Sequence, residues 1–117
     1  MMWSRAVALC LLMLAGAPAL AQDPLQTDGD KYKLKFENDR VRVLEYRDMP
    51  GDRTQQHDHP AFVLYAPAQF EREITLPDGK VLKRSFEAGD VIWSDAQTHI
   101  GHNVGKTPTH VIIVELK

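Results

Sequence analysis

The feature that most constrains the fold of this chain is a series of short, β-rich segments separated by turn residues. The clearest pair is 71–76 and 80–86, which flank the tripeptide Pro-Asp-Gly at 77–79. Asp-Gly between alternating segments is among the strongest short-range signals for a β-hairpin, because glycine readily adopts the positive φ that tight turns need. We therefore predict that these two segments pair as antiparallel neighbours.

The rest of the chain after residue 30 repeats this pattern. Segment 31–36 alternates charged and apolar residues with period two, and 110–116 is too rich in β-branched residues to favour a helix. Many short strands with turns between them predict an all-β, antiparallel sandwich or small barrel that forms one domain, residues 31–117. The remaining expected strands are 41–46, 57–65 and 91–93, and turns are expected at 37–40, 49–52, 87–90 and 95–98.

The first 21 residues have the order of a secretory signal peptide. Arg5 gives the start a positive charge, an apolar run covers 6–14, and Ala19-Leu20-Ala21 forms an A-x-A cleavage site. The apolar run is too short to span a bilayer. We predict cleavage after Ala21 and a periplasmic or secreted mature chain without a membrane anchor. An uncleaved N-terminal anchor is the alternative.

Removal of 21 of the 117 residues would leave 96 residues and no cysteine, since the one cysteine is Cys10. A mature chain without cysteine has no disulfide, no thiolate metal ligand and no cysteine nucleophile. The net charge of −2 becomes −3 without Arg5 and includes no basic block, which argues against nucleic acid or an anionic membrane as partner. Residues 22–30 are polar, contain Pro24 and Gly29, and predict a flexible N-terminal segment before regular structure starts.

Three histidines are the candidate metal ligands. His57 and His59 are one residue apart in an expected strand, so both project from the same face with Cα atoms about 6.5–7 Å apart. Two nitrogens rarely suffice for a stable site, and a further ligand from another strand is needed. His99 is the natural candidate, because it begins a strand after a polar turn and is separated from the pair by enough chain for a hairpin and return.

Two motifs around these histidines resemble those of the RmlC-like cupins. In 51–59, a glycine and five further residues precede His-x-His, as in the first cupin motif. In the second, Gly-Asp-Val-Ile-Trp at 89–93 is followed by His99 and, after three residues, by Asn103. The likeness covers roughly 38–117. It implies a small single-domain cupin: an antiparallel double-stranded β-helix, or jelly-roll barrel, with a divalent metal ion inside.

The chain departs from the cupin pattern at one ligand. A typical first motif places a glutamate four or five residues after the second histidine, where this chain has Val63 and Leu64. The resemblance then implies a site of three neutral histidines, similar to those that hold ferrous iron in cupin-like thiol and diketone dioxygenases. Such a site leaves open positions that attract small polar or anionic chelating molecules. Iron, manganese, zinc, nickel and copper all accept imidazole, so the ligands do not identify the metal.

Other polar residues are weaker candidates. Gln55 precedes the expected strand and Tyr65 ends it, and both are candidates to contact a bound ligand. Loop polarity explains Gln55 equally well, and aromatic residues in strands, such as Tyr65, most often pack in the core. Asn103 is a candidate to orient a ligand or, equally, to hold a turn. We expect His102 to face away from His99 and to be solvent-exposed.

Glu45 and His110 complete the candidates. Glu45 is the one acidic residue in an apolar strand segment, and is either a partner of a metal ligand or an exposed charge. His110 begins the last strand and is expected at the surface or the rim.

The function we expect is that of an exported cupin that binds a divalent metal through His57, His59 and His99, together with a small polar or anionic molecule. Metal-assisted oxidation by dioxygen or isomerisation would suit such a site, and no residue stands out as general base. The alternative is a non-catalytic periplasmic module that binds a small molecule, with the histidines retained in a metal-free barrel or bonded to a polar ligand. Small jelly rolls often pair through edge strands, so the β-branched final strand favours a homodimer.

Overall fold

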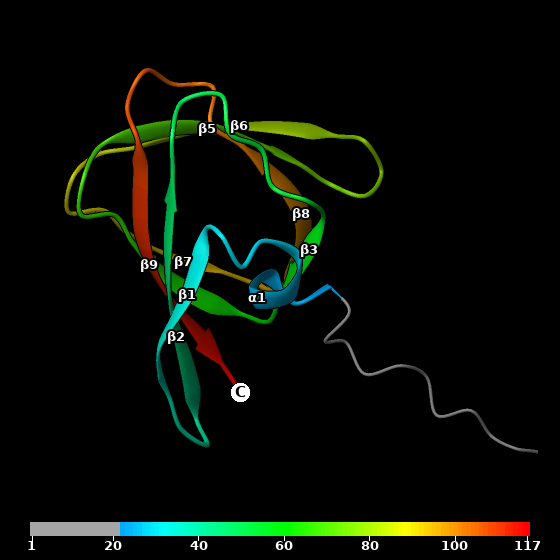
Figure 1. The fold of residues 1–117 in the computed structure, drawn as a ribbon, viewed down its shortest axis with the longest axis vertical. Coiled ribbons are helices and arrows are strands. Elements are labelled where there is room, and N and C mark those ends of the chain that lie inside the picture. Colours follow the sequence, from blue (N-terminus) through cyan, green and yellow to red (C-terminus); the bar gives the residue numbers. More distant parts are fainter. Residues whose placement is uncertain (1–21) are drawn as a thin grey trace, which may run out of the picture.

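The computed structural model describes residues 22–117, so the predicted signal peptide at 1–21 lies outside the described residues. Two antiparallel sheets surround a common interior, and strands close in sequence often lie in different sheets (Figure 1). The five-stranded sheet has the order β1-β2-β9-β4-β7, and the four-stranded sheet has the order β3-β8-β5-β6. The elements are α1 (Pro24–Thr27), β1 (Tyr32–Glu37), β2 (Val41–Asp48), β3 (His57–His59), β4 (Phe62–Tyr65), β5 (Phe70–Thr75), β6 (Val81–Phe86), β7 (Val91–Ser94), β8 (Gln97–His102) and β9 (Thr109–Leu116).

The predicted hairpin is confirmed. β5 pairs with β6 from Phe70 opposite Phe86 to Thr75 opposite Val81. Gly79 lies in the turn with φ of 88°, in the left-handed region that glycine adopts without steric cost. The Asp-Gly signal therefore identified the hairpin.

The strand expected over 57–65 is two strands. β3 pairs with β8 in the four-stranded sheet, whereas β4 pairs with β7 and β9 in the other sheet. Pro60 lies between them, exposed, and has no N–H with which to continue a ladder. The chain crosses from one sheet to the other at this point, and the prediction of one continuous strand is wrong. The expected turn at 95–98 is also shorter, because β8 already begins at Gln97.

The final strand lies inside its sheet. β9 pairs with β2 along its whole length and with β4 on its other side. The edges of the five-stranded sheet are β1 and β7. The expectation that the final strand offers an edge for dimer formation is therefore wrong, since both of its edges are already paired.

The N-terminal segment contains a turn of helix that the sequence did not predict. The Asp23 side chain caps α1 by accepting a hydrogen bond from the Leu25 N–H at 2.8 Å, and proline occupies the first turn. Asp28, directly after the helix, is buried and accepts a hydrogen bond from the backbone N–H of Gln55 at 3.0 Å. The segment therefore packs against the barrel next to β3.

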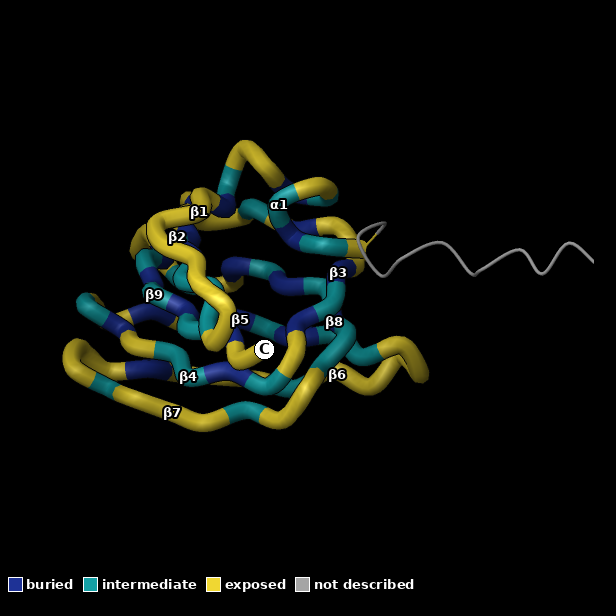
Figure 2. Tube along the Cα trace, turned by 90° about the horizontal axis from the view of Figure 1, so that it is seen from below, coloured by how far each residue is buried: buried dark blue, intermediate teal, exposed yellow. Residues whose placement is uncertain are grey.

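The core takes side chains from both sheets, and buried residues lie along strands of each sheet (Figure 2). Phe70 and Phe86 stack with ring centroids 4.6 Å apart, across the β5–β6 hairpin. Leu44 of β2 and Ile113 of β9 are almost fully buried and lie opposite each other in register. Each such side chain contributes about 1.5–3 kcal/mol through removal of apolar surface from water.

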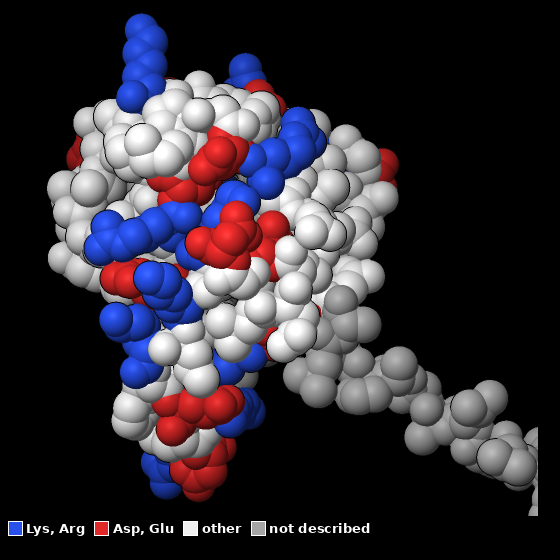
Figure 3. All heavy atoms as spheres, in the orientation of Figure 1, with Lys and Arg blue, Asp and Glu red and all other residues white. Residues whose placement is uncertain are grey.

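The β1–β2 hairpin extends past the barrel, and residues 33–40 are exposed along it (Figure 1). Lys, Arg, Asp and Glu side chains of both signs are interspersed there and over the rest of the visible face (Figure 3). Among residues 22–117, no helix has the length and apolar character needed to cross a bilayer.

Candidate metal centre

Three histidines from two strands meet in the interior. His57 and His59 come from β3, and His99 comes from the neighbouring β8. One ring nitrogen from each lies within 4.8 Å of the others, and the ring centroids are 4.8 to 5.2 Å apart. All three side chains are buried. The structure therefore brings together the three residues that the sequence singled out.

The strand geometry explains this convergence. Residues i and i+2 of a strand face the same side, which places both β3 histidines inward. β8 runs antiparallel to β3, with His99 directly opposite His57. The residue between the histidines, Asp58, faces outward and accepts a hydrogen bond from the Thr98 hydroxyl at 2.5 Å.

The Nδ1 atoms of His57 and His59 each meet an acceptor. His57 Nδ1 lies 2.9 Å from the backbone carbonyl of Gln55, and His59 Nδ1 lies 2.6 Å from a carboxylate oxygen of Glu115. Both acceptors lack a proton to donate, so the imidazole Nδ1 carries it. In a neutral ring, Nε2 then holds the free lone pair.

His99 follows the same rule. Its Nδ1 donates to the side-chain oxygen of Gln97, 2.6 Å away and two residues earlier on β8. All three rings therefore present Nε2 as the acceptor atom. Hydrogen bonding of the opposite ring nitrogen is the usual way in which proteins orient metal-binding histidines.

Burial keeps two of these rings neutral. Desolvation is the main cause that lowers the pKa of His57 to about 4, and the neighbouring His59 is the second cause. Desolvation likewise lowers the pKa of His99 to about 2, with His59 and His57 as further causes. Neutral imidazole is the form that binds a metal ion.

Glu115 is a site residue that the sequence analysis missed. It is almost fully buried on β9, accepts a hydrogen bond from Arg42 Nε at 2.8 Å and forms an ion pair with Arg42 Nη2 at 2.7 Å. Alternate residues of β9 from Thr109 onward are buried, and Glu115 occupies one of these inward positions. The sequence signal that could have identified Glu115 is a carboxylate at an inward-facing position of an otherwise apolar strand.

Tyr32 is a second missed residue. Its hydroxyl lies 3.1 Å from His57 Nε2 and donates to it, since His57 Nδ1 already carries the ring proton. Burial raises the pKa of Tyr32 well above its usual value, which keeps the hydroxyl protonated. Asp28 lies 3.6 Å from the Nδ1 atom of the same histidine. The N-terminal segment and β1 therefore cover the His57 side of the cluster.

The side chains of Gln55 and Asn103 form hydrogen bonds with other protein groups and do not point to the histidine cluster as ligand contacts would. The Gln55 side chain donates to the carbonyl of Thr27 at 3.0 Å, so only its backbone carbonyl touches the cluster. Asn103 is fully buried, but its amide donates to Asp48 at 2.9 Å and to the carbonyl of Thr107 at 3.0 Å. Of the two roles considered for Asn103, its hydrogen bonds match the turn contact.

Tyr65 lies outside the site. It is exposed at the end of β4 and does not line the interior cavity, whereas Leu64 does. His102 points away from the histidine cluster, with Nδ1 3.5 Å from the Arg53 guanidinium.

Glu45 forms its hydrogen bond elsewhere. It accepts from His110 Nε2 at 3.0 Å, and this bond lowers the pKa of the Glu45 carboxyl. Glu45 is therefore not a partner of the candidate metal ligands.

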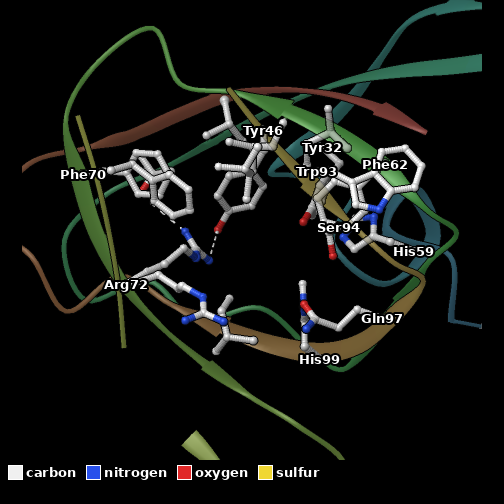
Figure 4. Close-up of a pocket in the computed structure, with 18 residues that line it drawn as sticks. Tyr32, Tyr46, His59, Phe62, Phe70, Arg72, Trp93, Ser94, Gln97 and His99 are labelled. Carbon is white, nitrogen blue, oxygen red and sulfur yellow. Dashed lines mark hydrogen bonds between the residues drawn. The ribbon is translucent and has the colours of Figure 1, made fainter. Parts of the chain in front are cut away.

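A cavity of about 160 Å³ adjoins the histidines. Figure 4 shows His59, His99 and Gln97 on one side of it and Arg72 and Tyr46 on the other. Phe62, Phe70, Phe86 and Trp93 form aromatic walls. His57 does not line the cavity.

Comparison with known proteins places the fold. A cupin domain from Bordetella pertussis Tohama I is similar with a TM-score of 0.67 and 23% identity, over 74% of this chain and 91% of that protein. An RmlC-like cupin with a double-stranded β-helix fold from Methanocaldococcus jannaschii has a TM-score of 0.58 and 13% identity, over 73% and 77% of the two chains. The polyketide cyclase RemF from Streptomyces resistomycificus has a TM-score of 0.55 and 16% identity, over 73% and 63%.

Neither a protein-family model nor a curated protein matches the chain in sequence. The structural likeness and the strand topology nevertheless agree with the jelly-roll expectation drawn from the two motifs. The chain therefore has the double-stranded β-helix fold of the cupins, with three buried histidines positioned to hold a metal ion.

Proposed function

We propose that this protein binds a divalent metal ion through the Nε2 atoms of His57, His59 and His99, and that a small polar or anionic molecule binds beside it. The observation that carries this proposal is the combination of two features. Three ring nitrogens lie within 4.8 Å of one another, and each Nδ1 atom is held by a separate acceptor. The donor set fits a first-row divalent ion, and iron, manganese, zinc, nickel and copper are all candidates.

Most Nε2 atoms of the histidine cluster have no hydrogen-bond donor within residues 22–117. Tyr32 donates to the Nε2 atom of His57, but within residues 22–117 no donor reaches the Nε2 atom of His59 or His99. A purely structural role would leave these acceptors to water in a cavity with aromatic walls. A metal ion would satisfy all three at once.

The surrounding residues would set the charge at the site. Three neutral imidazoles do not offset a double positive charge, and the nearest carboxylate, Glu115, shares its own charge with Arg42. Such a site favours an anionic molecule. When bound, the ion would supply Lewis acidity or, in the case of iron, activation of dioxygen.

If the protein is an enzyme, we propose oxidation by dioxygen or isomerisation of a small oxygen-rich molecule. The polyketide cyclase among the structural neighbours supports the view that this fold accommodates catalysis, although 16% identity transfers no activity. The Tyr32 hydroxyl lies 3.1 Å from the His57 Nε2 atom and would have to release this atom when a metal ion binds there.

The test is metal content, measured by elemental analysis of protein purified without chelator. We expect about one equivalent in the unmodified protein and a loss in His57→Ala, His59→Ala and His99→Ala. His102→Ala is the matched control, because this histidine lies on the opposite face of β8, and it should keep its metal. Absence of stoichiometric metal from the unmodified protein, with unchanged ligand binding in His57→Ala, would refute the proposal.

Oxygen uptake by the iron-loaded protein with a panel of thiols and diketones then separates the catalytic from the binding version. Turnover that disappears in His99→Ala would identify an oxygenase. Ligand binding without turnover would identify the non-catalytic binding module instead.

Export is a further part of the proposal and is supported by the sequence of residues 1–21. Expression of the full chain in a bacterium with a general secretion pathway should yield a product that starts at Gln22. Mass spectrometry of the periplasmic fraction measures this directly, and a cytoplasmic product that retains Met1 would contradict it.

A further inference from the structure

Two arginines lie side by side on the wall of the cavity. Arg72 of β5 and Arg84 of β6 are directly opposite each other in the hairpin register, and both line the cavity. Like charges directly opposite on neighbouring strands destabilise a sheet. Arg84 has no ion pair within residues 22–117. The hairpin therefore places positive charge at the cavity beyond what its own partners neutralise.

Arg72 is buried, yet its hydrogen bonds are long. Its guanidinium lies 3.4 Å from Asp48, 3.5 Å from the Thr109 hydroxyl and 3.4 Å from the Tyr46 hydroxyl. Good N–H···O bonds measure about 2.7–3.2 Å, and buried guanidinium–carboxylate pairs are commonly shorter and bidentate. No bond from the Arg72 Nε atom is found in the described part of the chain. The guanidinium therefore retains donors for another acceptor.

Asp48 does not fully occupy Arg72, because other donors surround it. The Tyr46 hydroxyl donates to one of its oxygens through a short hydrogen bond. The other oxygen accepts from the Asn103 amide at 2.9 Å and from the Thr109 N–H at 3.3 Å. The aspartate charge is spread over these neutral donors, and the guanidinium remains at the edge of the network, next to the cavity.

A glycine makes room for the guanidinium. Gly101 occupies an inward position of β8, two residues after His99. A Cβ atom at this position would lie 2.2 Å from Arg72 Nη2, which is shorter than real contacts permit. Any side chain at 101 would displace the guanidinium. The strand that carries a candidate metal ligand thus also shapes the space for the arginine.

The cavity separates this arginine from the histidines. Figure 4 shows Arg72 on one side of the hollow and His59 and His99 on the other. Its volume of about 160 Å³ resembles that of apolar cavities of roughly 150 Å³, which bind benzene. Aromatic side chains also line the cavity, and they include Tyr46, Phe62 and Trp93. The cavity therefore has a cationic side and a histidine side, with aromatic side chains on its wall.

We propose that Arg72 and Arg84 form an anion subsite for a small carboxylic acid with an apolar body of about one ring. The carboxylate would accept charge-assisted hydrogen bonds from the guanidinium groups, and burial strengthens the bond from Arg72, whereas Arg84 is exposed. A polar group at the other end of the molecule would face the histidines. That last point rests on the proposed function, whereas the anion subsite itself does not need the metal.

The test compares three ring compounds of nearly equal shape: benzoate, benzamide and benzamidinium. Binding is measured by calorimetry or NMR titration, on protein as purified and after treatment with chelator. In the metal-free protein we expect benzoate to bind at least tenfold more tightly than benzamide, and benzamidinium to bind most weakly. Equal affinity for benzoate and benzamide would overturn the proposal, as would the absence of benzoate binding at millimolar concentrations.

Variants assign the effect to the arginines. Arg72→Gln should remove the preference for benzoate, and Arg84→Gln should reduce it severalfold. Arg47→Gln is the matched control, because this arginine is exposed on β2 and should leave the preference unchanged. Gly101→Ala is a second test that keeps the arginine but displaces its guanidinium, and remains informative if Arg72→Gln does not fold. A preference that survives in either Arg72→Gln or Gly101→Ala would contradict the proposal.

The two proposals fail separately. Chelator treatment removes the metal ion without changing any side chain of the cavity, and the benzoate preference should persist in the metal-free protein. A protein that binds no metal but prefers benzoate would refute the metal proposal alone. A protein that binds metal but does not distinguish benzoate from benzamide would refute only the anion subsite.

Discussion

Two buried polar clusters lie in the same barrel and differ in how their hydrogen bonds close. The aspartate cluster consists of Asp48 and its donors Tyr46, Asn103 and Thr109. Both carboxylate oxygens accept from neighbours, and the Asn103 oxygen accepts from a backbone N–H at 3.0 Å. The cluster ties β2, β9 and the loop after β8 together. Polar groups that satisfy one another in this way specify structure.

The histidine cluster, His57, His59 and His99, is satisfied on its outer side, whereas on its inner side the described residues provide a donor to His57 alone, the Tyr32 hydroxyl. Each Nδ1 atom has an acceptor, but the Nε2 atoms turn toward one another. Neutral rings cannot donate to one another from these atoms. The difference teaches that burial alone does not distinguish a structural cluster from a candidate binding cluster. The two are distinguished by whether acceptor atoms without donors, here the Nε2 atoms, point toward a common centre.

The largest expected effect comes from breaking the aspartate cluster. Asp48→Ala removes the carboxylate nearest Arg72 and leaves a buried positive charge without compensation. We expect a loss of about 3–5 kcal/mol in the free energy of unfolding, measured by denaturant titration. Asp58→Ala is the control, since within residues 22–117 this outward carboxylate accepts from Thr98 alone, and the change should cost about 1 kcal/mol or less. Equal losses in the two variants would contradict the assigned role of Asp48.

Metal addition should act on the other cluster. A ligand present at a hundred times its dissociation constant stabilises the folded state by about 2.7 kcal/mol. We expect a rise of this order when a binding metal ion is added to the chelator-treated protein, measured by denaturant titration. His99→Ala should abolish the rise and His102→Ala should retain it. A rise in His99→Ala equal to that of the unmodified protein would place the metal elsewhere.

Removal of the Glu115 charge should weaken metal binding without removing a ligand. Glu115→Gln changes the acceptor of His59 Nδ1 from a carboxylate to an amide. Loss of such an orienting partner typically lowers metal affinity by about 10–100-fold, which competition with a chelator measures. Glu45→Gln is the matched control, because Glu45 pairs with His110 away from the cluster. An unchanged affinity in Glu115→Gln would show that this carboxylate does not tune the site.

The sequence predicted the features that depend on local geometry. Period two in β3 places His57 and His59 on one face, and the turn glycine at 79 identifies the hairpin. The third candidate ligand, His99, was predicted from its place at a strand start after a polar turn and from the resemblance of the motif around it. These predictions needed no knowledge of which strand pairs with which.

The features that depend on long-range pairing were not predicted. β9 is central because β2 and β4 pair with it from distant parts of the chain, and this brings Glu115 to His59 across 56 residues. Tyr32 reaches His57 across 25 residues in the same way. The partners that orient the ligands were therefore harder to find than the ligands themselves.

The smallest expected effect on stability is that of Tyr32→Phe, and the direction of its effect on metal affinity is the most informative. Its hydroxyl donates to the His57 Nε2 atom that a metal ion would use. Tyr32→Phe removes this hydrogen bond from the metal-free protein alone, and we expect the free energy of unfolding to fall by about 0.5–1.5 kcal/mol.

Since the metal-bound form would lose nothing at this atom, linkage requires metal affinity to rise by the same free energy, which corresponds to about two- to tenfold. Chelator competition measures the affinity, and denaturant titration of the metal-free protein measures the stability. Tyr65→Phe is the control, because the Tyr65 side chain is exposed and outside the cavity. A fall in affinity in Tyr32→Phe would contradict this expectation. It would mean that the Tyr32 hydroxyl stabilises the metal-bound form and does not compete with the metal ion for His57 Nε2.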